Sequence, residues 1–279
     1  MKKLSLDGFM RLRKLVFRGA RPLEFTMWKA AFENGSMEDF LGVVSAYQNE
    51  DGGFGHNMEA NLWNPNSSPE ITAYALGQIE RAGRGWPEKD HPIVKGVLKY
   101  LASGAYATET GWICGIPSNL DYSHAPWFGY DPQNEIVRLL DPLVDFIFRY
   151  ADPGSAFYHK AVALDTIRKS KKPAALPDFK DFDPSKFEPW NESPVSFVRS
   201  PDSAHYPAYQ KLVDAELDAM VDRLHGTNEL PVASYKDCWE DAAQVIGSYY
   251  WASSDFIHEV QTLDTFGRLE FLLPILMEA

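Results

Sequence analysis

The 279-residue chain is acidic, with 27 lysines and arginines against 39 aspartates and glutamates and a formal net charge of −12. This charge opposes binding to the phosphates of nucleic acids and to an anionic membrane surface, so we expect neither partner. Hydrophobic residues make up 45% of the chain and aromatic residues 14%, enough for a substantial core, and we predict a single domain over residues 1–279.

The N-terminal residues resemble a signal peptide only briefly. Asp7 and the basic run at residues 11–14 interrupt any apolar stretch, which argues against secretion. The chain also lacks a run of eighteen apolar residues, the length needed to span a bilayer. We therefore predict a cytoplasmic protein in which Cys114 and Cys238 are reduced thiols.

Apolar residues recur at helical spacing along most of the chain, and no stretch shows the sustained alternation of a strand. The predicted helices span residues 5–18, 22–33, 37–48, 69–82, 91–102, 133–150, 155–169, 206–225, 240–250 and 257–270. Helix pairs that recur after roughly forty to fifty residues are typical of an α/α toroid with inner and outer helices, and also of a helical solenoid. The sequence therefore predicts an all-α protein.

One turn is especially informative. In residues 47–54, an apolar helical run ends at a glutamine, and an Asp-Gly-Gly turn and an aromatic residue follow. Gly52 and Gly53 can adopt a positive φ, so the chain can reverse sharply there. The next helix begins at residues 68–70, where a serine N-cap precedes a proline and an acidic residue.

This unit of helix, Gln-x-x-Asp-Gly-Gly-aromatic turn, loop and helix resembles the repeat of the terpenoid cyclase and protein prenyltransferase superfamily. Residues 110–112, Thr-Gly-Trp, resemble a degenerate copy without the glutamine. Residues 47–127 as a whole are similar to a family of small bacterial proteins in that superfamily. The matching residues are Gly52-Gly53-Phe54-Gly55-His56, Glu59, Ser67-Ser68-Pro69, His91-Pro92 and His124-Ala125-Pro126-Trp127. One departure is Glu59-Ala60-Asn61, where the family pattern is Glu-Pro-Asp.

The resemblance implies an α/α toroid in which inner helices surround a central cavity. The Asp-x-Asp-Asp and Asp-Asp-x-x-Asp motifs of terpenoid cyclases are both absent, which weighs against ordinary cyclisation. Protein prenyltransferases bind zinc through an Asp-x-Cys pair and a histidine, and the nearest match here is Asp237-Cys238. In one interpretation, Asp237 and Cys238 bind zinc with His124 or His258 as a third ligand, although adjacent helical residues point about 100° apart and reach one ion with difficulty. In the other, Cys238 is a buried, inert packing residue.

Residues 170–203 interrupt the helical rhythm with six prolines and five aromatic residues. A loop of this length in a compact domain is usually functional or disordered, and its aromatic content argues against disorder. We predict an ordered strap over one end of the domain, with a structural role or the role of a lid.

The best candidates for chemistry follow the second repeat. Asp121 and His124 could form an acid–base pair beside Trp127, although Asp and His side chains in turns commonly bind local backbone groups. His56 and Glu59 form a second candidate pair beyond the glycine turn. Further candidate ligand-binding residues are Trp112 and Trp239.

Three functions compete. The first is binding or transformation of a small hydrophobic molecule in an aromatic-lined cavity, which the resemblance and the aromatic content favour, although large aromatic residues also pack between helices. The second is a carbohydrate-active α/α-barrel enzyme with Glu59 and Asp121 as its paired carboxylates. The third is a non-catalytic scaffold whose barrel is filled. The first is our prediction, and whether the protein is an enzyme stays open.

Overall fold

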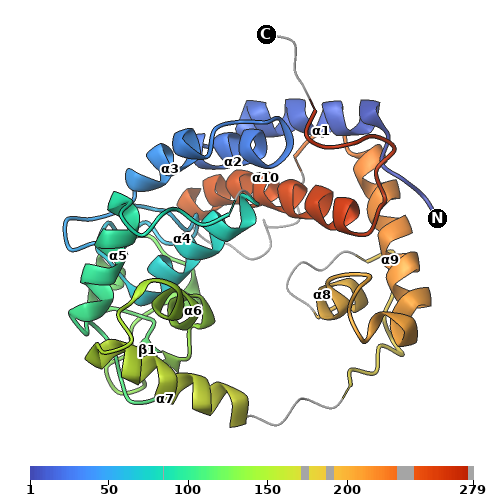
Figure 1. The fold of residues 1–279 in the computed structure, drawn as a ribbon. Coiled ribbons are helices and arrows are strands. Elements are labelled where there is room, and N and C mark those ends of the chain that lie inside the picture. Colours follow the sequence, from blue (N-terminus) through green and yellow to red (C-terminus); the bar gives the residue numbers. More distant parts are fainter. Residues whose placement is uncertain (84, 171–175, 187–191, 231–241, 276–279) are drawn as a thin grey trace. The chain divides into compact units, whose positions relative to one another are not determined.

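The computed structural model describes residues 1–83, 85–170, 176–186, 192–230 and 242–275, with backbone alone for residues 242–246. This part of the chain is mostly helical (Figure 1), which confirms the prediction of fold class at that level. Its helices are α1 (Leu6–Gly19), α2 (Pro22–Phe32), α3 (Met37–Ser45), α4 (Pro69–Arg81), α5 (Pro92–Ala102), α6 (Asp141–Tyr150), α7 (Ala156–Ser170), α8 (Pro194–Val198), α9 (Tyr206–Gly226) and α10 (Ala242–Thr265). Its shorter elements are β1 (Trp112–Ile113), β2 (Val137–Arg138) and the 3-10 helices η1 (Pro117–Asp121) and η2 (Pro126–Phe128).

The structure differs from the predicted elements in three places. The helix predicted for residues 133–150 begins only at Asp141, because Pro142 in its first turn lacks an N–H and hinders an upstream turn. The helices predicted for 240–250 and 257–270 are one helix, α10, which no glycine or proline interrupts between residues 251 and 256. The predicted strap contains a short helix, α8.

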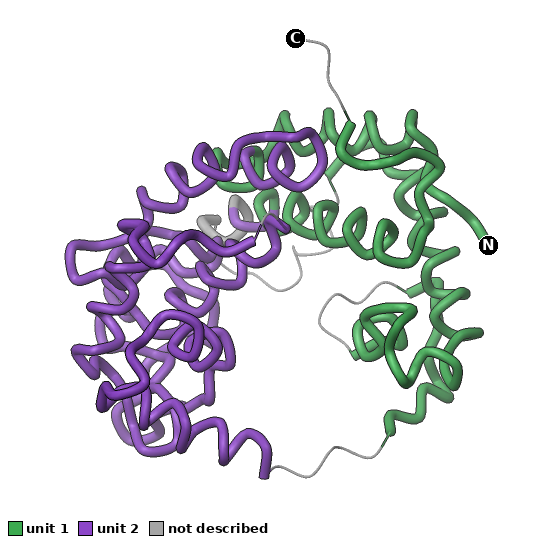
Figure 2. Tube along the Cα trace, in the orientation of Figure 1, with its two compact units in different colours: residues 1–25, 173–232, 249–279 green, residues 26–172, 233–248 purple. Residues whose placement is uncertain are grey.

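The chain divides into two compact units (Figure 2). Unit 1 contains residues 1–25, 173–232 and 249–279, and unit 2 contains residues 26–172 and 233–248. In the described residues, no helix is long and apolar enough to cross a membrane.

In unit 1, a buried arginine ties the segment after α10 to α9. The guanidinium of Arg268 is 3% exposed and lies 2.5 Å from Asp214 and 2.7 Å from Asp218. Part of the predicted strap packs on the same helix, since Phe179 and Phe197 lie 5.6 and 5.4 Å from the ring of Tyr209. These contacts show that residues on both sides of residues 187–191 are ordered against α9.

In unit 2, α6 contacts α4, α5 and α7. The N-terminus of α4 is set by Ser68, whose hydroxyl accepts a hydrogen bond from the backbone N–H of Ile71 at 3.2 Å. Pro69 follows at the first helical position, as the sequence predicted. Ile71, Leu76 and other apolar residues of α4 are buried, so the helix contributes one wall of the unit's core.

The glycine turn fixes the loop between α3 and α4 against α5. The side-chain amide of Gln48 donates hydrogen bonds to the carbonyl oxygens of Gly52, at 2.9 Å, and Ile93, at 3.1 Å. Gly52 has a φ of +92°, and a Cβ at this position would lie 1.9 Å from the carbonyl oxygen of Gly96. The glycine is therefore needed both for its backbone conformation and for close approach to α5.

We expect Gly52→Ala to destabilise the protein by at least about 2 kcal/mol, because the added methyl group collides with backbone atoms in a left-handed conformation. Chemical denaturation would measure this loss. Gly77→Ala in α4 is the matched control, because its Cβ would meet no atom within 4 Å. That substitution should stabilise the helix by up to about 1 kcal/mol, so similar losses for both variants would contradict our account of the turn.

Candidate functional site

Two loops of unit 2 that carry the predicted catalytic residues are joined by backbone hydrogen bonds. The N–H of Trp63 donates to the carbonyl of Ser123 at 3.0 Å, and the N–H of Ala125 donates to the carbonyl of Asn61 at 2.8 Å. The segment that contains Glu59 thus lies beside the segment that contains His124. The sequence placed these candidates in two separate loops and gave no signal for their pairing.

Glu59 and His56 have different environments. Glu59 is 3% exposed, and one carboxylate oxygen accepts a hydrogen bond from the backbone N–H of Asn61 at 2.7 Å. His56 is exposed, has a φ of +55°, and lies with its Nε2 2.7 Å from the side-chain oxygen of Asn49. Both side chains therefore stabilise their own loop, and the predicted pairing of the two for chemistry stays a prediction.

Asp121, His124 and Trp127 lie near the surface of unit 2. Nδ1 of His124 lies 2.7 Å from the carbonyl oxygen of Tyr122, which is the local backbone contact that competed with an acid–base role. Asp121 is exposed, and its carboxylate forms no hydrogen bond or ion pair with any described residue. Trp127 is 43% exposed and lies 6.1 Å from the ring of Phe128. The catalytic roles of this group stay predictions.

Beneath these loops lies a buried network of asparagines. The amide of Asn64 donates to the hydroxyl of Ser118 at 2.8 Å and to the side-chain oxygen of Asn119 at 2.7 Å. Asn119 in turn donates to the carbonyl of Phe128 at 2.7 Å. Asn61 is 1% exposed, yet neither polar atom of its side chain has a partner among the described residues. The three asparagines at 61, 64 and 66 could have indicated this network from the sequence. The sequence analysis considered only Asn61, as a departure from the family pattern.

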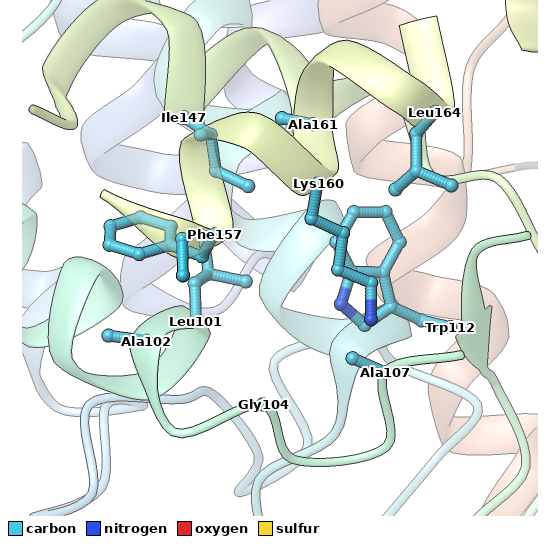
Figure 3. A pocket seen from close by; sticks show the side chains of 11 residues that line it. Leu101, Ala102, Gly104, Ala107, Trp112, Ile147, Phe157, Lys160, Ala161 and Leu164 are labelled. Atoms are coloured by element: carbon cyan, nitrogen blue, oxygen red, sulfur yellow. The ribbon is translucent and has the colours of Figure 1, made fainter. Parts of the chain in front are cut away.

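A pocket of about 230 Å³ opens elsewhere in unit 2, between α5, α6, α7 and the start of the β1–β2 hairpin (Figure 3). Trp112 lines it, and the other predicted ligand-binding and catalytic residues that the structure describes do not. Its lining is Leu101, Ala102, Gly104, Ala107, Trp112, Ile147, Ala156, Phe157, Lys160, Ala161 and Leu164. The pocket is therefore apolar, with two aromatic rings and one charged group.

The hairpin fixes Trp112 by pairing it with Arg138, whose side chain binds α4. Nη1 of Arg138 lies 2.6 Å from the carboxylate of Glu70, which burial gives a raised pKa. Burial and the charge of Glu70 raise the pKa of the Cys114 thiol to about 12. At neutral pH this thiol is protonated, so Cys114 is a packing residue and not a nucleophile.

A buried acid in unit 1 was missed by the sequence analysis. Glu259 of α10 is 4% exposed and accepts a hydrogen bond from Arg223 of α9, and its second oxygen has no partner among the described residues. Burial raises the pKa of Glu259 to about 7 against the opposing effect of Arg223, and Asp255 adds to the rise. A single glutamate within a long amphipathic helix resembles a solvated residue, so periodicity gave no signal.

The predicted zinc ligands Asp237 and Cys238, and the predicted ligand-binding Trp239, lie outside the described residues. Within the described part of the chain, no three His, Cys, Asp or Glu side chains are grouped to hold a metal ion. The chain matches no protein-family model, no curated protein and no solved structure. The resemblance to terpenoid cyclases and prenyltransferases therefore stays a prediction.

The asparagine network makes a pair of substitutions informative. We expect Asn64→Ala to destabilise the protein by about 1–3 kcal/mol, because it leaves the side-chain oxygen of the fully buried Asn119 without its hydrogen-bond donor. Asn61→Ala should destabilise the protein less than Asn64→Ala, by less than about 1 kcal/mol, because it removes two buried polar atoms that have no partner among the described residues. Equal losses in urea denaturation would show that the Asn61 amide is hydrogen-bonded in solution.

The raised pKa of Glu259 predicts that the protein becomes less stable as the pH rises. A carboxyl with a higher pKa in the folded than in the unfolded chain binds more protons when folded, so stability is lost as the pH rises from about 5 to about 8. Glu259→Gln should stabilise the protein at pH 8 by roughly 1–3 kcal/mol and have little effect at pH 5. Thermal denaturation at both pH values tests this, with the exposed Glu229→Gln as a control that should show no such dependence. The same effect for both variants would refute the assignment.

Proposed function

We propose that the protein binds a small hydrophobic molecule and that the apolar pocket of unit 2 is its binding site. The observation that carries this proposal is the lining of the pocket, in which the indole of Trp112 and the ring of Phe157 lie among aliphatic side chains. Small-molecule sites are usually concave and apolar, with a few polar groups that orient the ligand. This lining has that composition.

The size of the pocket limits the ligand. An apolar protein cavity of about 150 Å³ holds benzene, so one of about 230 Å³ suits roughly nine non-hydrogen atoms. That is an aromatic ring with a short substituent, or a branched hydrocarbon of similar volume, such as an isoprenoid unit. The pocket is partly open, so a long polyprenyl chain or an oligosaccharide would extend beyond it into solvent. The lining is mostly apolar and contains no carboxylate, so it supports the hypothesis of a hydrophobic ligand over that of a carbohydrate-active enzyme.

We further propose that the helices form an α/α toroid like that of terpenoid cyclases and protein prenyltransferases. The mostly helical chain and the glutamine-capped glycine turn support this proposal. The helix content and the turn are compatible with a toroid, and the toroidal arrangement itself is what the sequence resemblance implies. The predicted catalytic residues Asp121, His124 and Glu59 contribute no side chain to this pocket, so we propose binding there and no reaction.

Blocking the mouth of the pocket tests the proposed function. Ala156 is an exposed lining residue at the start of α7, so Ala156→Phe should fill the entrance without disturbing the core. Ligand-observed NMR titrations with phenylacetate and 2-phenylethanol should detect binding to the native protein and at least tenfold weaker binding to this variant. Val162→Phe is the matched control, because Val162 is 46% exposed and lies outside the pocket lining on the same helix. Failure of both compounds to bind the native protein would overturn the proposal.

A further inference from the structure

Lys160 adds a positive charge to the otherwise apolar lining of the pocket. Of the residues that line the pocket, it carries the one charged side chain. Figure 3 shows this side chain running from α7 in the direction of the Trp112 indole, with Phe157 and Leu101 on the other side of the view. The residue is half-buried, so its methylene groups can cover apolar surface while its ammonium group faces the ligand.

The ammonium group of Lys160 forms no hydrogen bond and no ion pair with any described residue. Other cations of α7 are paired: Arg168 lies 2.7 Å from Asp165 and 2.9 Å from Asp145, and Lys169 lies 2.6 Å from Asp165. The carboxylates of Asp145 and Asp165 thus pair with Arg168 and Lys169, which lie about two turns of α7 beyond Lys160. Lys160 keeps its charge available to a ligand.

The adjoining helix ends favour an anion as well. Ala156 and Phe157 form the first turn of α7, where the helix dipole places partial positive charge beside the pocket. The C-terminal end of α5, which also borders the pocket, has the opposite partial charge. There, the carbonyl groups of Lys99, Tyr100 and Leu101 already accept hydrogen bonds from the backbone of residues 103 and 104, which reduces their effect on a ligand.

We propose that Lys160 makes this pocket selective for small hydrophobic monoanions, such as arylalkyl or short branched carboxylates. This inference rests on the proposed function. The apolar walls would hold the hydrocarbon part, and the ammonium group would bind the carboxylate at the pocket's edge by a charge-assisted hydrogen bond. A single lysine, with no arginine in the lining, suits one negative charge better than the two charges of a phosphate ester.

Three probes of similar size, each with one phenyl ring, separate charge from hydrophobicity: phenylacetate, 2-phenylethanol and 2-phenylethylammonium. If the proposal is correct, ligand-observed NMR titrations will give phenylacetate a dissociation constant roughly tenfold below that of the alcohol, with the ammonium compound binding most weakly. Equal affinity for the acid and the alcohol would overturn the anion selectivity and leave the proposed function intact. No binding by any of the three would overturn both.

Variants of Lys160 then assign the selectivity to this residue. Lys160→Met should reduce the preference for phenylacetate to within about twofold of the alcohol, while Lys160→Arg should keep most of it. The control is Lys14→Met, which removes the same charge from an exposed site on α1 in unit 1 and should leave the preference unchanged. A preference that persists in Lys160→Met, or that is lost equally in Lys14→Met, would refute the role of Lys160. Thermal denaturation of each variant confirms that it is folded.

Discussion

The close approach of the glycine turn to α5 is the contact from which the rest of unit 2 is built. A Cβ at Gly52 would lie 1.9 Å from the carbonyl oxygen of Gly96, and the side-chain amide of Gln48 occupies the space that a Cβ at Gly96 would need. Once this contact is fixed, the loop after the turn is held by Asp51, which binds the N–H of Gly53 and the hydroxyl of Ser67. Ser67 precedes the N-cap of α4, so the turn determines where α4 begins.

The start of α4 in turn determines one wall of the pocket. Glu70, in its first turn, binds Arg138 of β2, and β2 pairs with β1 so that Arg138 lies opposite Trp112. The buried carboxylate is stabilised by this arginine, and the neighbouring Cys114 remains a neutral thiol. The indole of Trp112 is therefore positioned by a chain of polar contacts behind it, although its exposed surroundings in the pocket are apolar. This arrangement keeps the ion pair of Glu70 and Arg138 out of the pocket lining, which is mostly hydrophobic.

The helices were predictable because each buries one apolar face, and this periodicity survives without knowledge of tertiary contacts. The hairpin was not, since strands of two residues are too short to show alternation and depend on pairing between residues 24 and 26 positions apart in sequence. The glycine-aromatic pattern at residues 111–112 singled out Trp112, which lines the pocket, and its role in ligand binding stays a prediction. Lys160 gave no such signal, because a lysine among apolar residues on a helix resembles a solvated side chain whose stem covers the core. Its importance comes from missing partners, which only a structure reveals.

The charge of the whole chain and the charge at the pocket have opposite signs, and the distance over which each acts decides their roles. At physiological ionic strength, charges in solvent are screened beyond about 8 Å. The net charge of −12 is spread over the surface, so most of it lies too far away to oppose a ligand already seated against α7. Lys160 acts on that ligand directly and across apolar walls, where screening is weaker than in water. An acidic protein can therefore hold a small organic anion, provided that its one local cation is left unpaired, as Lys160 is among the residues around this pocket.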